Sequence, residues 1–118
     1  MSKERSRSIK TAQLKLRELN IKLNGTLATP TVTGFDQYQV SSVVDLGVGN
    51  YTVIFSNPFE RACQLGGVAS LTADIDVQVT AVAFDRITVK CMDAATGLAA
   101  TEADLFLCIK GSDSRYDV

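Results

Sequence analysis

From about residue 36 onward, short runs of alternating apolar and polar residues follow one another along the chain. In the clearest run, 75–83, the odd positions are all apolar and alternate with Asp76, Gln78 and Thr80. An alternation with a period of two predicts a β-strand that buries one face and leaves the other in water. The same pattern predicts strands at 39–44, 51–56, 61–71, 75–83, 87–91 and 105–109. Short strands at this spacing predict a mainly β protein, built as a small antiparallel β-sandwich or roll.

Glycines mark the turns between these runs. Gly47 and Gly49 allow the chain to reverse at positive φ directly before the strand at 51–56. Gly66-Gly67 predicts a bulge or turn inside a weaker strand, and Thr96-Gly97 predicts a turn in the loop before the last strand.

Helical spacing replaces the alternation near the N-terminus. Five apolar residues are separated by three and four positions, and this heptad-like pattern predicts an amphipathic α-helix over about 8–24. They are Ile9, Ala12, Leu16, Leu19 and Leu23. Glu18 and Lys22 are placed for a helical ion pair, and Gly25 supplies a left-handed stop. Because an isolated helix of this length is marginal in water, we expect these five residues to form an oligomer or docking interface.

A strand is the alternative for the same segment. Residues 14–16 and 19–23 also alternate with a period of two, as an amphipathic strand does. In a helix, Leu14 and Ile21 widen the apolar face, which favours a trimer or packing on a sheet over a two-stranded coil. We expect the helix.

These patterns divide the chain into four parts. We expect a basic N-terminal arm and helix at 1–24, a linker at 25–35, a β-domain at 36–111 and a flexible tail at 112–118. Apolar runs reach nowhere near the roughly 18 residues of a membrane-spanning helix, and the N-terminus does not have the pattern of a signal peptide.

Charge is unevenly distributed over these parts. Residues 1–24 contain seven basic and two acidic residues, a net charge of +5, whereas 25–118 contain five and eleven, a net charge of −6. The basic arm residues Lys3, Arg5, Arg7 and Lys10 could contact an acidic protein or nucleic acid. Nucleic acid is the less expected partner, because the first 34 residues contain no aromatic side chain to stack on bases and the rest of the chain is acidic.

Residues with catalytic or ligand-binding chemistry are sparse. The chain has no histidine, and Cys63, Cys91 and Cys108 form no Cys-x-x-Cys pair, so we expect neither zinc nor a disulfide framework. Cys91 and Cys108 lie in alternating apolar runs and are predicted to be small buried hydrophobes, with a reactive thiol or a Cys91–Cys108 bridge as the alternatives.

Other candidate sites are weaker. Asp74 and Asp76 could hold a hard cation, but charge that protects a sheet edge is the expected role. A carbohydrate platform would have to be built from exposed aromatic residues. The contributors would be Phe35, Tyr38, Tyr51 and Phe59.

The stretch at 45–59 carries the strongest functional signal. It reads Asp-Leu-Gly-Val-Gly-Asn-Tyr-Thr-Val-Ile-Phe-Ser-Asn-Pro-Phe, in which Tyr51, Val53 and Phe55 fall on one strand face. It resembles a β-domain common at the C-terminal ends of bacteriophage fibre and appendage proteins, where a Gly-x-Gly-x-Tyr-Thr-Val-x-Phe-x-x-Pro phrase recurs. Residues 87–111 also resemble the way such domains finish. That family's β-domains are typically trimeric and lie at the distal or attachment end of an appendage.

The resemblance implies a small virion appendage or decoration subunit, because the chain contains no long repetitive shaft. We therefore expect a structural virion protein of a tailed phage, located in the virion and assembled in the host cytoplasm. Its expected partners are other copies of itself, as a homo-trimer, and other capsid or tail proteins. We expect no enzyme activity, no cofactor and no membrane partner. A nucleic-acid-binding protein that uses the basic arm is the main alternative, and a carbohydrate-binding module is a weaker one.

Overall fold

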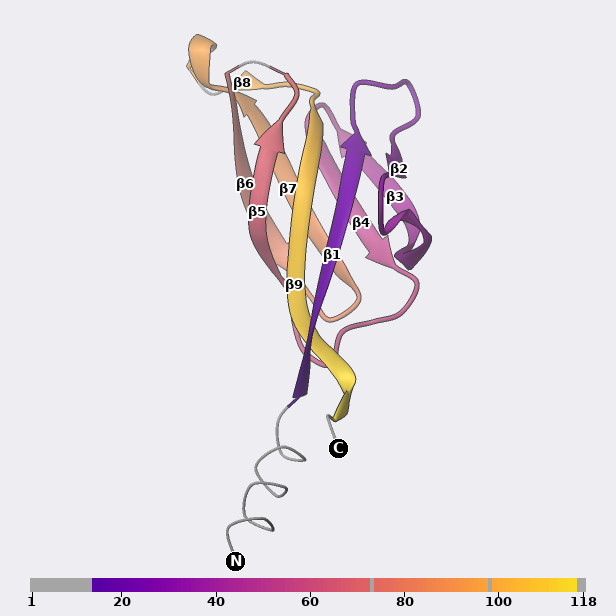
Figure 1. Cartoon of the computed structure of the whole chain (residues 1–118). Coiled ribbons are helices and arrows are strands. Elements are labelled where there is room, and N and C mark those ends of the chain that lie inside the picture. Colours follow the sequence, from indigo (N-terminus) through magenta and orange to yellow (C-terminus); the bar gives the residue numbers. More distant parts are fainter. Residues whose placement is uncertain (1–13, 73, 98, 117–118) are drawn as a thin grey trace, which may run out of the picture.

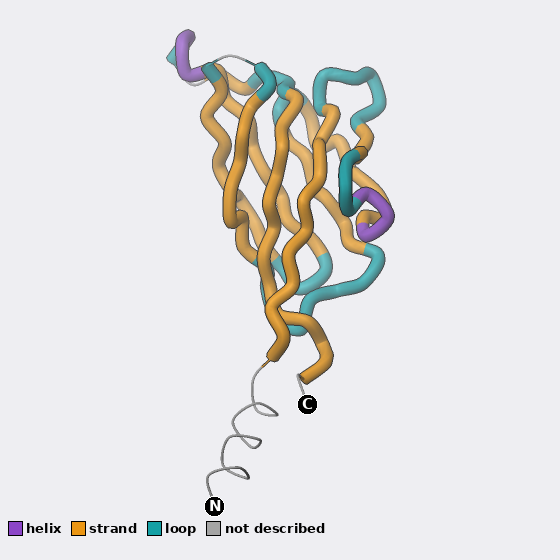
Figure 2. The backbone as a smooth tube through the Cα atoms, viewed as in Figure 1, coloured by secondary structure: helices purple, strands orange, loops and turns teal. Residues whose placement is uncertain are grey.

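The structure is a computed structural model that describes residues 14–72, 74–97 and 99–116. These residues form two antiparallel β-sheets that face each other (Figures 1 and 2). Its elements are β1 (Leu14–Asn24), β2 (Thr31–Thr33), the short 3-10 helix η1 (Gln37–Gln39), β3 (Val40–Gly47), β4 (Asn50–Phe55), β5 (Gln64–Ser70), β6 (Ile75–Val82), β7 (Arg86–Asp93), the 3-10 helix η2 (Ala94–Thr96), β8 (Ala99–Ala100) and β9 (Asp104–Tyr116). Sheet A has the strand order β2-β1-β9-β5. Sheet B has the order β3-β4-β7-β6, and β8 also pairs with β7.

The first and last strands form the centre of sheet A. β1 pairs with β9 from Leu14 opposite Tyr116 to Asn24 opposite Asp104, with one irregularity between Leu14 and Leu16. The two strands therefore enter and leave the domain at the same end (Figure 1).

The core lies between the sheets, because alternation turns one row of side chains of each central strand inward. In β1 this row is Leu19, Ile21 and Leu23, each no more than 2% exposed. The inward rows of the other central strands contribute most of the remaining cluster, to which Phe59, Cys63 and Ala103 also belong. These inward rows are Tyr51, Val53 and Phe55 in β4, Ile87, Val89 and Cys91 in β7, and Leu105, Leu107 and Ile109 in β9.

The β3–β4 hairpin confirms the expected turn. Gly47 has φ of 130° and Gly49 has φ of 73°, so both adopt backbone conformations that favour glycine. The register shift between Leu65 and Gly67 confirms the bulge in β5, and Gly97 takes the left-handed conformation after η2. The strands expected between 39 and 109 are present, with bounds that differ by a few residues.

The helix expected over 8–24 is wrong for residues 14–24, which form β1. The physical reason is the core. A strand buries Leu19, Ile21 and Leu23 on one face and satisfies its backbone by pairing with β9, whereas Leu16 of the proposed helical seam is 70% exposed. Residues 8–13 lie outside the described residues.

Two local predictions fail together with the helix. Glu18 and Lys22 are four residues apart on one face of a strand, so they do not form a helical ion pair. Gly25 does not adopt positive φ, and instead allows close approach to Ala103 and Tyr51. The segment expected as a linker contains β2, and the segment expected as a flexible tail continues β9 as far as Tyr116. The sandwich therefore begins at β1 and not at residue 36.

Candidate interaction surface

The outer face of sheet A is built from rows of residues that cross its strands. The register aligns Asn20 of β1 with Cys108 of β9 and Gly67 of β5. The next row aligns Lys22 with Phe106 and Ala69. Because directly paired residues share a face, and Ile21 and Leu107 between these rows point into the core, both rows point outward. In these two rows β5 contributes only the small residues Gly67 and Ala69.

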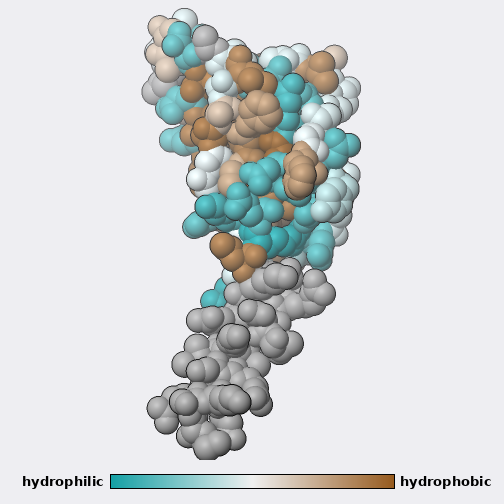
Figure 3. Space-filling model, viewed as in Figure 1, coloured by the Kyte–Doolittle hydropathy of each residue, from teal (hydrophilic) through white to brown (hydrophobic). Residues whose placement is uncertain are grey.

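These rows surround an open hollow of about 430 Å³. Its lining includes Phe35, Phe106, Gly67, Ala69 and Cys108. Phe35 is 87% exposed and Phe106 is 47% exposed, so two aromatic rings border the hollow without being covered by the domain. Figure 3 shows apolar side chains gathered over the upper half of this face and hydrophilic side chains over its lower half.

Phe35 is held at the β2 margin of sheet A by the backbone on either side of it. The Asp36 N–H donates to the Asn20 carbonyl at 3.0 Å, and the Asn20 N–H donates to Asp36 Oδ2 at 2.7 Å. Gly34, with φ of 104°, packs against the backbone of Ile21. These contacts continue the pairing of β2 along β1, and they fix Phe35 at the level of residues 20–22.

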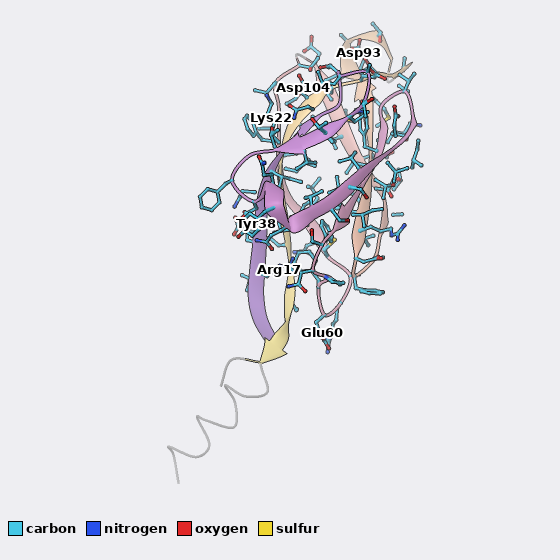
Figure 4. All side chains as sticks on the ribbon, turned by 90° about the vertical axis from the view of Figure 1, so that its right-hand side faces the viewer. Arg17, Lys22, Tyr38, Glu60, Asp93 and Asp104 are labelled. Atoms are coloured by element: carbon cyan, nitrogen blue, oxygen red, sulfur yellow. The ribbon has the colours of Figure 1, made fainter. Side chains whose placement is uncertain are left out.

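Four charged residues surround the apolar centre, two on β1 and two on β9. Glu18 is paired with Lys110, whereas Lys22 and Asp104 lie toward the other end of the same strands. Figure 4 shows Lys22 and Asp104 near one end of sheet A, with Arg17 of β1 toward the opposite end. The four formal charges cancel.

Glu18 also contacts the thiol of Cys108, which donates to Glu18 Oε1 at 3.1 Å. This hydrogen bond and a second from Asn20 lower the pKa of Glu18, with Lys110 assisting. Partial burial raises the pKa of the Cys108 thiol, and the Glu18 carboxylate adds to the effect.

The sequence-predicted interface is not assembled as expected. Leu19 and Leu23 are core residues, and Leu16 alone among the described members of that set is exposed. Ile9 and Ala12 lie outside the described residues, as do Lys3, Arg5, Arg7 and Lys10 of the basic arm. The sequence reasoning missed the hollow itself, although it named Phe35 as a possible platform residue.

Arg17 contacts the folded domain. Its guanidinium lies 4.4 Å from the centre of the Phe59 ring, a cation–π contact. It also donates from Nε to Gln39 Oε1 and from Nη1 to the Pro58 carbonyl, each at 3.2 Å. One of the basic residues counted with the arm is therefore engaged in the fold.

Of the four aromatic residues that the alternative carbohydrate platform would need, two are buried and two are exposed. Tyr51 and Phe59 are 0% and 2% exposed, whereas Phe35 and Tyr38 are exposed. Within the part of the chain that the structure describes, no cluster of three or more metal-ligating side chains occurs, and Asp74 and Asp76 lie at the start of β6 with the latter on the outer face of sheet B. No helix in that part is long and apolar enough to cross a membrane.

The cysteines divide between core and surface, and all three are unpaired. Cys91 is buried as expected, and burial raises its pKa to about 11. Cys108 is not a core residue, because it occupies an outward position of β9, and it forms no bridge with Cys91. Cys63 is buried beside β7, where its thiol lies 3.8 Å from the Arg86 carbonyl.

No protein-family model, curated protein or solved structure matches the chain.

Proposed function

We propose that the protein is a structural virion protein of a tailed phage, a head or tail fibre or decoration subunit that acts by oligomeric assembly and docking on other capsid or tail proteins. One observation carries the proposal: the outer face of sheet A presents a 430 Å³ apolar hollow bordered by exposed Phe35 and Phe106. Contiguous exposed apolar surface rimmed by polar residues is typical of protein-interaction sites. The resemblance of 45–59 to phage fibre domains supports the virion as the place of assembly.

The position of that resemblance in the fold fits a structural role. Tyr51, Val53 and Phe55 are core residues, and the two glycines before them form the hairpin turn. The phrase therefore supplies turn and core residues of the sandwich, and its role in the core leaves the outer faces available to partners. The proposed location is the virion, with assembly in the host cytoplasm and no membrane partner.

Self-association remains part of the proposal, with a homo-trimer as the expected assembly. Leu19 and Leu23 are buried within the domain and are not available for a helical interface. We therefore place the proposed interface on the outer face of sheet A.

Immunogold electron microscopy tests the proposed function. Particles are purified from a lysate in which the gene is expressed, and an antibody against the chain is applied to them. We expect gold at a defined head or tail position and the chain among the virion proteins by mass spectrometry. Unlabelled particles, with the chain confined to the particle-free fraction, would contradict the proposal.

Nucleic-acid binding by the basic arm is the second candidate, because the net charge of residues 1–24 is +5. It predicts an affinity for nucleic acid that falls steeply with salt and is lost when residues 1–10 are deleted. That deletion leaves β1 intact, because the strand begins at Leu14. Glutamine at positions 3, 5, 7 and 10 provides a matched variant of full length.

A further inference from the structure

We infer that the occupant of the hollow is a second copy of this chain, with Phe35 of one copy seated over Gly67 and Ala69 of the next. This inference rests on the proposed function, and it names the partner that binds the outer face of sheet A. A rotation axis relates the copies. It runs parallel to the strands of sheet A and lies in front of the outer face of this sheet.

The shape of the face supports this arrangement. Phe35 projects at the β2 margin at the level of residues 20–22, and Gly67 and Ala69 lie at the β5 margin in the rows of Asn20 and Lys22. The projecting ring and the small residues are thus at one level but at opposite margins, three strand spacings of about 4.8 Å apart. Rotation about an axis parallel to the strands brings the β2–β1 half of one copy against the β9–β5 half of the next and keeps the level unchanged.

Charge supports the same pairing of halves. In the row nearest the chain ends, the β1 half carries Glu18 and the β9 half carries Lys110. Toward the other end, the β1 half carries Lys22 and the β9 half carries Asp104. Each half therefore faces opposite charges on its neighbour, and like charges are kept apart. Within one copy, the Asn20 amide and the Cys108 thiol both donate to Oε1 of the Glu18 carboxylate.

The neutrality of the face also distinguishes it from the rest of the domain. Its four charges cancel, whereas residues 14–116, from the start of β1 to the end of β9, contain eight basic and eleven acidic residues, a net charge of −3. Two copies approaching through this face avoid the repulsion that other surfaces of an acidic protein impose. In a reciprocal pair, each half of one copy contacts the unlike half of its partner, whereas in a three-membered ring each copy contacts one neighbour through its β2–β1 half and the other through its β9–β5 half.

Light scattering of the full chain tests the inference. We expect a dimer or trimer for the unchanged chain and the mass of one chain, 12.7 kDa, for Phe35→Ser. Tyr38→Ser is the matched control, because Tyr38 is another aromatic residue, 73% exposed, that does not line the hollow. It should leave the assembly unchanged. Because Phe35 is 87% exposed, its replacement should not unfold the domain, and circular dichroism checks this.

A charge exchange provides the second test. Glu18→Lys and Lys110→Glu should each place like charges across the interface and weaken assembly at least tenfold. Both changes together should restore it. Asp76→Lys, an equal change in charge on sheet B, should have no such effect.

A monomeric unchanged chain would overturn the inference, as would an assembly indifferent to Phe35→Ser or single exchanges that the double exchange fails to rescue. The proposed function would survive these results if the particles were still labelled. Unlabelled particles with an intact Phe35-dependent assembly would instead overturn the function and keep the interface.

Discussion

The hydroxyl of Tyr51 donates a 2.9 Å hydrogen bond to the carbonyl oxygen of Gly25. Tyr51 lies in β4 of sheet B, whereas Gly25 directly follows β1 of sheet A, so the bond connects the two sheets across the core. Gly25 in turn donates its N–H to the Ala103 carbonyl at 3.1 Å. An added Cβ at Gly25 would lie 2.6 Å from the Tyr51 hydroxyl, which explains why glycine is needed there.

Tyr51→Phe should lower the free energy of unfolding by about 1–3 kcal/mol, because it leaves the buried Gly25 carbonyl without this donor. Urea denaturation measures the change. Tyr38→Phe removes the hydroxyl of an exposed tyrosine and should change stability by less than about 0.5 kcal/mol. Equal stability of the two variants would contradict a structural role for the hydrogen bond.

The same tyrosine should make stability depend on alkaline pH. Burial raises the pKa of Tyr51 to about 12, above its ordinary value of 10.0. As the pH rises from 10 toward 12, the unfolded chain loses this proton while the folded chain keeps it. The unfolded state then binds fewer protons, so the free energy of unfolding falls over this range. Urea midpoints of the unchanged chain should therefore fall more steeply with pH than those of Tyr51→Phe, and parallel profiles would refute the assignment.

Gly111→Ala should destabilise the domain by about 1–3 kcal/mol, since a Cβ there would lie 2.8 Å from Phe59 Cε1. Phe59 cannot easily move, because it contacts the edge of Phe55 at 5.2 Å between ring centres and lies under Arg17. Gly67→Ala is the control in sheet A, and both changes are compared in the Phe35→Ser variant, in which assembly through this face does not contribute to stability. The Cβ added at Gly67 would meet only Cys108 Cβ, at 3.8 Å, so thermal melting should show no loss of stability.

Cys108 should be the most reactive thiol of the folded chain. In the Phe35→Ser variant, which leaves the face uncovered, a short iodoacetamide pulse should label Cys108, whereas Cys63 and Cys91 should react only after unfolding. Glu18→Gln should speed the labelling of Cys108, because it removes a charge that raises the pKa of the thiol. Mass spectrometry of peptides separates the three sites, and equal labelling of Cys91 and Cys108 would contradict the assigned faces.

Much of the fold is readable from local pattern. The alternation in 51–56 and 87–91 gave the correct inward residues, and the glycines before Tyr51 gave the correct turn, because both signals depend on near neighbours alone. At 14–24 two periods compete. Leu16, Leu19 and Leu23 suit a helix, whereas Leu19, Ile21 and Leu23 suit a strand. The partner that decides between them, β9, lies some 90 residues away, and its pairing supplies the strand's hydrogen bonds.

The candidate surface was harder to predict for a related reason. Gly67 and Ala69 are unremarkable as sequence, and they form the floor of a hollow only because the bulge in β5 places them beside Cys108 and Phe106. Phe35 contributes only because Asp36 bonds to Asn20. Each relationship depends on strand register, which local periodicity does not determine.

The central place of β9 in sheet A has a consequence for the order of folding. All pairing partners within sheet B precede residue 101, so sheet B can form without β9. β1 and β5 both pair with β9, so Leu19, Ile21 and Leu23 of β1 remain exposed to water until β9 has joined sheet A. Long-range pairing of this kind slows folding, and it prolongs the time during which exposed apolar side chains can cause aggregation. We therefore expect the docking of β9 between β1 and β5 to limit the rate at which the native domain forms.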